Sequence, residues 1–395
     1  MTTPLERSNP APVPPTAEVA SPGGAGGANI AWLSDHVSAF VVNGRFTSQR
    51  MTGVQRVACE LTDALQRLLP AQRHLPVIVP HDACSERRAL RDEVKSRWLR
   101  GMAWEQLILP FATRGHTLLS LCNMGPLWKR QQIVMIHDMA VFDEGQNYSW
   151  KFRWWYRFAF WMLRLNARHI VTVSSFSRDR IVKHLHIDES RISIVRNAVD
   201  HFDRIEREPS ILTRLDLVAD RYVLFVGSLA VSKNLARVLS AIKLLDGGRD
   251  FKFVIVGRAN PRVFSGKHQE VEDLPPDVVM AGAVSDEELK SLYENAGCFL
   301  FPSLYEGFGL PPLEAMYCGC PVIVSREASL PEVCGDAAMY CDAYSVADIA
   351  HKITNMMGDA NLRDRYRLLG REHARQYRWD VSARALLGVL DKIAP

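Results

Sequence analysis

The chain has 395 residues, of which 47% are hydrophobic and 23% are charged, and its formal net charge is +4 at pH 7. This length exceeds one ordinary hydrophobic core and predicts two domains of a globular protein. The mild charge gives no support to nucleic-acid binding, and no apolar run is long enough to predict a transmembrane helix.

The N-terminal 28 residues are rich in proline, alanine and glycine. We expect a disordered tail over 1–28, because so little apolar surface cannot offset the entropy of ordering the chain. The eight cysteines are scattered without a CxxC pair, and no signal peptide is recognised. This pattern predicts reduced thiols in a cytoplasmic protein and no metal site.

From residue 29 onward, short apolar runs alternate with amphipathic stretches. The runs predict buried strands at 74–80, 115–121, 132–138, 169–174, 222–228, 252–257, 277–282, 298–303 and 320–325. The amphipathic stretches predict helices at 54–69, 149–167, 234–245, 285–296 and 312–318. Strands that alternate with helices predict an α/β fold with parallel sheets covered on both faces.

The alternation pauses over the charged stretch 200–221, which predicts a linker between two α/β halves of similar size. Ligands of open parallel sheets bind beyond the carboxyl ends of the strands. Two such sheets that face each other therefore predict a binding cleft between the halves.

The stretch YEGFGLPPLEAMYCGCPVIVS (305–325) places two carboxylates around a glycine-bearing turn. Glu306 lies in the loop after the strand at 298–303, and we expect Glu314 in the first turn of the next helix. The backbone N–H groups at that helix start form an anion site; they belong to Gly307, Phe308, Gly309 and Leu310. A phosphate flanked by carboxylates suggests a nucleotide-sugar, with Glu314 on the ribose and Glu306 on the hexose. The alternative is a capped helix with two acids that have no ligand.

This stretch resembles the E-x7-E signature of the retaining glycosyltransferases of family 4, which have the GT-B fold. The segments that extend the resemblance are TGVQRVACEL (52–61), IVTVSSFSRDRI (170–181), ISIVRNAVD (192–200), YVLFVGSLAVSKN (222–234) and MAGAVSDEELKSLYENAGCFLFPS (280–303). It implies two Rossmann-like domains that face a central cleft.

The same resemblance implies where the domains begin and end. We expect an acceptor-binding domain over 29–205, a nucleotide-sugar-binding domain over 206–375, and a C-terminal helix over 376–395 that crosses back to the first domain.

Cations are expected beside the sugar diphosphate, because its charge must be stabilised as the glycosidic bond breaks. Lys233 lies at a helix start, and Arg258 follows the strand at 252–257. The family usually has a further arginine, but Ser228 stands at that position, which leaves a hydrogen-bond donor without charge. Val284 is also assigned to the donor site. The alternative for Lys233 is a solvated lysine at a helix end.

The resemblance implies that His137 contacts the transferred sugar, so His137, Lys233 and Glu306 are the expected catalytic residues. Asp138 can orient this histidine and is assigned, with Gln55 and Arg56, to the acceptor side. Gly53 is assigned to the donor, because its loop must approach closely. The alternatives are a core histidine and an ordinary helix cap.

The stretch 147–169 is aromatic and basic and carries no acid. Such a helix suits a membrane interface, where Arg153, Trp154, Trp155 and Arg157 would face the lipid. It equally suits a helix that packs the domain together. The basic stretch 87–100 would extend a membrane-facing surface.

These patterns together predict a metal-independent retaining glycosyltransferase that needs no cofactor. The favoured donor is GDP-mannose, and the acceptor is a glycan or a lipid-linked saccharide in polysaccharide biosynthesis. Transfer is expected by front-face departure and attack, with the leaving phosphate as base. We expect a cytoplasmic protein, in possible contact with the inner face of the membrane, and no nucleic-acid partner. The rivals are a nucleotide-sugar epimerase, a phosphorylase of the same fold, and an inactive scaffold homologue.

Overall fold

The computed structural model describes residues 36–83, 92–93, 99–227, 230–245, 249–257, 275 and 277–393. Four sequence predictions lie wholly or mostly outside these residues: the tail over 1–28, the basic stretch 87–100, Ser228 and Arg258.

The first sheet has seven parallel strands in the order β3-β2-β1-β4-β5-β6-β7. The strands are β1 (Phe40–Asn43), β2 (Val77–Val79), β3 (Asp92–Glu93), β4 (Thr117–Ser120), β5 (Gln132–Met135), β6 (His169–Thr172) and β7 (Ile192–Ile194). Strands β1, β2, β4, β5 and β6 are buried along their whole length, as expected for a sheet with helices on both faces. We call this sheet and its helices the first lobe.

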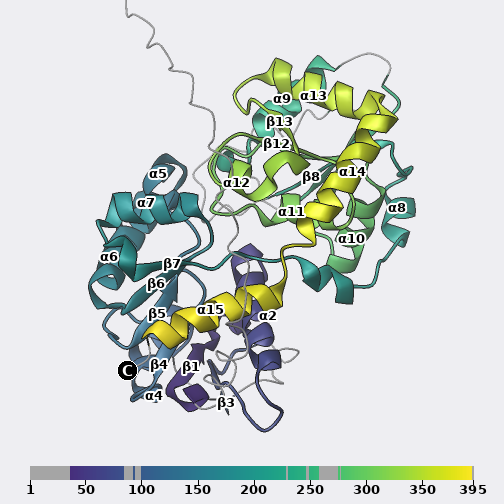
Figure 1. The fold of residues 1–395 in the computed structure, drawn as a ribbon. Coiled ribbons are helices and arrows are strands. Elements are labelled where there is room, and N and C mark those ends of the chain that lie inside the picture. The colour runs from purple at the N-terminus through teal and green to yellow at the C-terminus, as the bar shows by residue number, and fades with distance from the viewer. Residues whose placement is uncertain are drawn as a thin grey trace, which may run out of the picture.

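The second sheet has six parallel strands in the order β10-β9-β8-β11-β12-β13. The strands are β8 (Tyr222–Val226), β9 (Lys252–Val256), β10 (Val278–Gly282), β11 (Cys298–Phe301), β12 (Val322–Ser325) and β13 (Met339–Cys341). This sheet and its helices form the second lobe (Figure 1). The predicted α/β architecture with two parallel sheets is thereby confirmed.

Helices cover both sheets. In the first lobe they are α2 (Gly53–Leu68), α3 (Gly101–Leu107), α4 (Leu109–Ala112), α5 (Ala140–Asp143), α6 (Trp150–Asn166) and α7 (Ser175–Leu185). In and after the linker they are α8 (Ser210–Arg214), α9 (Leu235–Leu244), α10 (Asp286–Asn295), α11 (Leu310–Tyr317), α12 (Leu330–Cys334), α13 (Val346–Gly358), α14 (Ala360–Ala374) and α15 (Trp379–Ile393).

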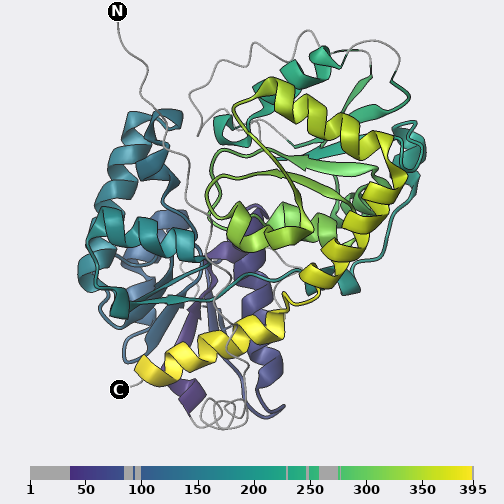
Figure 2. The ribbon, with the colours of Figure 1, turned by 45° about the horizontal axis from the view of Figure 1, so that its top comes forward.

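The C-terminal helix α15 returns from the second lobe to the first, where it packs against α2 (Figures 1 and 2). Its buried face includes Trp379, Leu386 and Leu390, which belong to one apolar cluster with residues of both sheets. The two lobes therefore share a core, and α15 ties them together.

Helix α11 begins at Leu310, two residues earlier than the prolines predict. Pro311 and Pro312 lie inside its first turn, where a missing N–H costs no hydrogen bond. Glu314 is consequently the fifth residue of the helix, and the prediction that it lies in the first turn is wrong by a fraction of a turn.

None of the helices in the described part of the chain is long and apolar enough to cross a membrane.

Candidate active site

A cavity of about 240 Å³ lies between the lobes, at the carboxyl ends of several strands. Its lining from the first lobe is Thr52, Gly53, Val54, Val57, His137, Asp138, Val173 and Asn197. Its lining from the second lobe is Lys233, Glu306, Gly307, Phe308, Gly309, Leu310 and Pro311. Nine residues assigned to the site from the sequence thus surround one cavity, which we call the cleft pocket.

Two helix N-termini border the cleft pocket. Helix α2 starts at Gly53 and α11 starts at Leu310, and the first residues of both helices line the cavity. Gly309 precedes α11 with φ 98°, a left-handed conformation that favours glycine. The dipoles of both helices therefore point positive charge at the pocket, which suits a diphosphate. Helix α2 adds free N–H groups, whereas Pro311 and Pro312 leave fewer of them at the start of α11.

Lys233 and Glu306 form an ion pair at the pocket wall. Ser303, just beyond β11, donates a second hydrogen bond to Glu306 Oε1 at 2.7 Å. The Lys233 ammonium also lies 5.1 Å from the centre of the Phe301 ring. Lys233 and Glu306 neutralise each other in this structure. A ligand phosphate could take the place of Glu306 beside Lys233, and a ligand hydroxyl could take the place of Lys233 beside Glu306.

Glu314 is the fifth residue of α11 and does not line the cleft pocket. The hydroxyl of Tyr293 donates to Glu314 Oε2 at 3.4 Å, and His201 Nε2 lies 3.9 Å from Oε1. Burial raises the pKa of Glu314 to about 7, although the Arg56 guanidinium acts in the opposite direction. Burial also lowers the pKa of His201 to about 3, so this imidazole is neutral and does not pair as an ion with Glu314.

His137 is buried at the end of β5, and its ring Nε2 lies 2.9 Å from the carbonyl oxygen of Leu121. A ring nitrogen that faces a carbonyl must carry the proton, which fixes the tautomer. Burial lowers the pKa of His137 to about 4, so the ring is neutral near pH 7. The expectation that Asp138 orients this ring is wrong, because the Leu121 carbonyl does so.

Asp138 instead accepts a hydrogen bond from the backbone N–H of Ala140 at 2.9 Å, at the start of α5. Burial raises the pKa of Asp138, and the negative charge of Glu306 acts in the same direction. The carboxylates of Asp138 and Glu306 therefore repel each other across the cleft pocket.

The lobes touch where Gly307 meets the first lobe. The carbonyl oxygen of Gly307 accepts hydrogen bonds from Ser174 Oγ at 2.6 Å and Ser177 Oγ at 3.0 Å. A Cβ at Gly307 would lie 2.1 Å from the carbonyl oxygen of His137. Glycine is therefore required here for the close approach of the two backbones, not for an unusual φ.

Two further contacts fasten the same interface. Glu332 of α12 accepts the backbone N–H groups of Ser175 at 2.9 Å and Phe176 at 3.2 Å, which are free donors at the start of α7. Tyr305 donates from its hydroxyl to Asp143 at 2.9 Å. The loop that carries Glu306 is thus held against the first lobe on both sides.

Sequence reasoning missed Asn197, which lines the pocket and is only 3% exposed. Its Oδ1 is buried without a hydrogen-bond partner in the described structure. A buried acceptor of this kind is costly unless a ligand satisfies it. Asn197 follows β7, and Ser303 follows β11, so the rule that ligands meet the carboxyl ends of strands could have found both.

Four described site residues predicted from the sequence do not line the cleft pocket: Glu314, Val284, Gln55 and Arg56. Val284 is half-buried against the main apolar cluster. Gln55 binds Thr52 and Gln49, on its own loop. Arg56 forms an ion pair with Asp286 and faces Glu314, which connects α2 to the second lobe.

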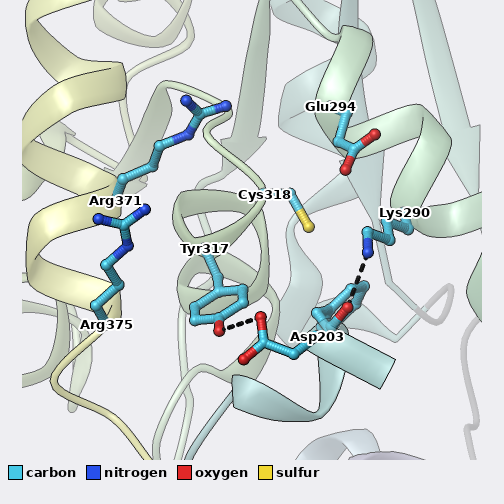
Figure 3. A pocket seen from close by; sticks show the side chains of 8 residues that line it. Asp203, Lys290, Glu294, Tyr317, Cys318, Arg371 and Arg375 are labelled. Carbon is cyan, nitrogen blue, oxygen red and sulfur yellow. Dashed lines mark hydrogen bonds between the residues drawn. The ribbon is translucent and has the colours of Figure 1, made fainter. Parts of the chain in front are cut away.

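A second cavity, of about 260 Å³, lies behind α11, beside the linker (Figure 3). Lys290 donates to the carbonyl oxygens of Phe202 at 2.8 Å and Ile205 at 2.6 Å, and Tyr317 donates to Asp203 at 2.6 Å. These hydrogen bonds attach the linker to the second lobe. We therefore assign this cavity a structural role and not a ligand-binding one.

Two family models match the chain on either side of the linker. Residues 51–201 match the model described as Glycosyltransferase Family 4, and residues 216–373 match the one described as Glycosyl transferases group 1. Together they include every described residue that lines the cleft pocket.

Two curated relatives and one solved structure illustrate the similarity. The chain is 34% identical over 229 residues to O-antigen chain mannosyltransferase B of Escherichia coli. The aligned region covers 54% of this chain and 58% of that protein. It is 30% identical over 250 residues to the MMP alpha-(1->4)-mannosyltransferase of Mycolicibacterium hassiacum, covering 62% of this chain and 59% of that protein. The chain thus spans a little over half the length of these relatives.

Among solved structures, HepE of Anabaena in complex with UDP and glucose superposes with a TM-score of 0.68 at 13% identity. The superposition covers 90% of this chain and 98% of that one. Such low identity speaks to the fold alone, and it agrees with two parallel sheets that face a cleft. The chain belongs to the glycosyltransferases of group 1 and family 4, which have the GT-B fold.

Proposed function

We propose that the protein transfers a mannosyl group from GDP-mannose, with retention at the anomeric carbon, to a glycan or lipid-linked saccharide in polysaccharide biosynthesis. The observation that carries this proposal is the Lys233–Glu306 pair, which lies between two helix N-termini in a pocket shared by both lobes. The mannosyltransferase names of the similar proteins support the choice of sugar.

The cleft pocket and Glu314 on α11, which lies outside its lining, together offer one group for each part of a nucleotide-sugar. Glu314 accepts the hydroxyls of the ribose, and Lys233 and the helix N-termini hold the diphosphate. Glu306 accepts hydroxyls of the hexose from one side. His137 and Asn197 contact the same sugar from the first lobe, and the neutral His137 adds no charge that would disturb the leaving diphosphate.

The reaction that we propose breaks the bond between the anomeric carbon and the diphosphate oxygen. The acceptor hydroxyl attacks from the face that the diphosphate leaves, so the anomeric configuration is retained. Its proton passes to a leaving phosphate oxygen. Lys233 and the N–H groups of α2 and α11 stabilise the negative charge that develops there.

A donor panel tests this proposal. Purified protein is incubated with GDP-mannose, UDP-glucose, UDP-N-acetylglucosamine and ADP-glucose, and release of the nucleoside diphosphate is measured. We expect GDP-mannose to be consumed fastest, and faster consumption of a UDP-sugar would contradict the donor assignment. Conversion of one nucleotide-sugar into another without release of nucleoside diphosphate would favour an epimerase. If none of the donors is consumed, an inactive scaffold protein would be favoured.

The pKa of Glu314 predicts how donor binding depends on pH. Ribose hydroxyls bind the ionised carboxylate, and a group with a pKa of about 7 loses its charge as the pH falls below that value. We therefore expect GDP-mannose to bind up to about tenfold more weakly at about pH 6 than at about pH 8. The donor has no phosphate that titrates in this range, so calorimetry reports the protein.

The matched control for this experiment is Glu314→Gln, which has no carboxylate to ionise. It should bind GDP-mannose more weakly at every pH, with a much flatter pH dependence. An unchanged pH dependence in this variant would assign the effect to another group and remove Glu314 from the ribose site.

Chelation should leave activity intact, because cationic and N–H groups of the protein serve the diphosphate. Within the described ranges, no three His, Cys, Asp or Glu side chains are grouped as metal ligands. The measurement is nucleoside diphosphate release with excess EDTA, against the same assay with added Mg²⁺. A complete loss that Mg²⁺ restores would contradict metal independence.

We also propose that the enzyme acts in the cytoplasm at the inner face of a membrane, where a lipid-linked acceptor is presented.

A further inference from the structure

The outer face of α6 carries large apolar side chains that the fold leaves uncovered. Trp150 is 73% exposed, Trp154 68%, Trp161 48% and Leu165 55%. Their spacing of four, seven and four residues puts them on one stripe of the helix. This stripe faces away from the sheet, because Phe160 and Leu163 on the opposite side are buried in the core.

The residues singled out in the sequence divide between these two sides. Trp154 and Arg157 are exposed, whereas Trp155 packs against the apolar cluster below α6 and Arg153 lies over Gly145. Domain packing therefore accounts for only part of the aromatic and basic residues of this helix. The exposed part remains to be explained.

The same stripe is basic and carries no acid. Lys151 and Arg157 of α6 are exposed beside the tryptophans, and Lys151 lies 5.6 Å from the centre of the Trp150 ring. Residues 145–178 contain no Asp or Glu. Between 99 and 137 the single acid is Glu105, which is buried and paired with Arg45.

Helices α3 and α4 and the loop around Trp128 extend this surface. Leu118 lies under α3 and α4, and Val134 lies under α6. Ser120 pairs with Val134, and Leu118 is two residues from Ser120, so both helical layers cover the same face of the sheet. Trp128, which is 73% exposed, adjoins α6 because Asn166 donates to the carbonyl oxygen of Leu127.

Eight of the fourteen large apolar side chains that are exposed in the described part of the chain lie on this surface. They are Met102, Leu107, Phe111, Trp128, Trp150, Trp154, Trp161 and Leu165. Soluble proteins rarely leave such a concentration open to water unless something covers it. We call this face the basic aromatic surface; its central residues are Trp150, Lys151, Trp154, Arg157 and Trp161.

We infer that the basic aromatic surface binds the interface of an anionic phospholipid membrane. Tryptophan rings are favoured at the boundary between headgroups and acyl chains, and Lys and Arg are attracted to anionic headgroups. A second copy of the chain is the poorer occupant, because two such surfaces would bring like charges together without a carboxylate between them. The inference deepens the proposed membrane location and rests on it.

The surface adjoins the cleft pocket at the start of α6. Asp138 lines the pocket and accepts a hydrogen bond from the N–H of Ala140 at the start of α5, and α5 packs against α6. A saccharide anchored in the bound membrane would therefore meet the enzyme beside the acceptor side of the cleft.

The test is co-sedimentation of the purified chain with vesicles of phosphatidylcholine alone or mixed with phosphatidylglycerol. We expect binding to the mixed vesicles only, with release at high salt. The double variant Lys151→Glu/Arg157→Glu should bind at least about tenfold more weakly. The double variant Trp154→Ser/Trp161→Ser should also bind more weakly. The affinity that it loses should depend less on salt than the affinity that the charge variant loses.

The matched control is Arg365→Glu/Leu368→Ser, which changes an exposed arginine and an exposed leucine on α14 of the second lobe. It should bind as the wild type does. Thermal melts and donor hydrolysis, measured on all variants, show whether each is folded and active. Because binding is read without any sugar transfer, failure of the donor panel and failure of this inference can be told apart.

Three results would overturn the inference. The first is a wild type that does not bind the mixed vesicles, and the second is a set of folded surface variants that bind as well as the wild type. A dimer in sedimentation velocity that the tryptophan variant converts to a monomer, without vesicle binding, would show that a second copy covers the surface.

Discussion

Replacing Lys233 with alanine is expected to lower donor turnover by about a hundredfold to a thousandfold, the range seen when one group that stabilises developing charge is removed. Lys233 contacts Glu306 in the cleft pocket, and no other described side chain that lines this pocket is a lysine or an arginine. Among the described groups that border this pocket, the helix N-termini would then remain to stabilise the leaving diphosphate. The measurement is release of GDP from GDP-mannose under saturating donor.

Loss of stability could imitate this effect, because Lys233→Ala leaves Glu306 without its cation. The double variant Lys233→Ala/Glu306→Gln removes the unpaired charge and should recover most of any lost melting temperature, but not the turnover. Lys243→Ala, an exposed lysine on α9, is the matched control and should behave as the wild type. More than half of the wild-type turnover in Lys233→Ala would show that other groups hold the diphosphate.

Replacing Gly307 with alanine is expected to lower turnover by about a hundredfold, as a shift of about one ångström between reacting groups can. The new methyl group would lie 2.1 Å from the carbonyl oxygen of His137 and 2.9 Å from Asp138 Cβ. Because the first of these is a backbone atom, the lobes must move apart. The hydrogen bonds from Ser174 and Ser177 to Gly307 would lengthen with them.

Binding and turnover separate this effect from general damage. GDP should still bind Gly307→Ala, because Glu314 and α11 lie within the second lobe, whereas transfer needs both lobes. Gly358→Ala is the matched control, since a Cβ there meets nothing within 4 Å. A Gly307→Ala enzyme within twofold of wild-type turnover would contradict the close approach of the lobes at this residue.

The fold could be read from the sequence because its strands are continuous apolar runs, and nine such runs coincide with observed strands. Among the strands that were not predicted, β7 and β13 give a weaker signal, whereas β1 is a buried run, FVVN, that the sequence analysis overlooked. Strand β7 has three residues with Ser193 in the middle, and β13 likewise has three residues. Pairing with the buried neighbouring strands β6 and β12 stabilises them, and this is a property of the sheet and not of the segment.

The site was predicted where backbone and charge follow directly from local sequence, as for Glu306 and the glycines beside it. What the sequence could not give is contact between segments far apart in the chain. Ser174 and Glu332 fasten the lobes through partners more than a hundred residues away. The ring of His137 is oriented by the backbone carbonyl of Leu121. Every residue has such a carbonyl, so the sequence does not indicate which one accepts the hydrogen bond.

The most direct test of the account follows GDP-mannose in the presence of the enzyme by proton NMR and identifies the anomeric configuration of the mannose first released or transferred. Since the donor has the α configuration, the account predicts an α product signal that precedes any β signal, together with formation of GDP. A first product of β configuration would contradict retention, and unchanged GDP-mannose beside a consumed UDP-sugar would contradict the assigned donor.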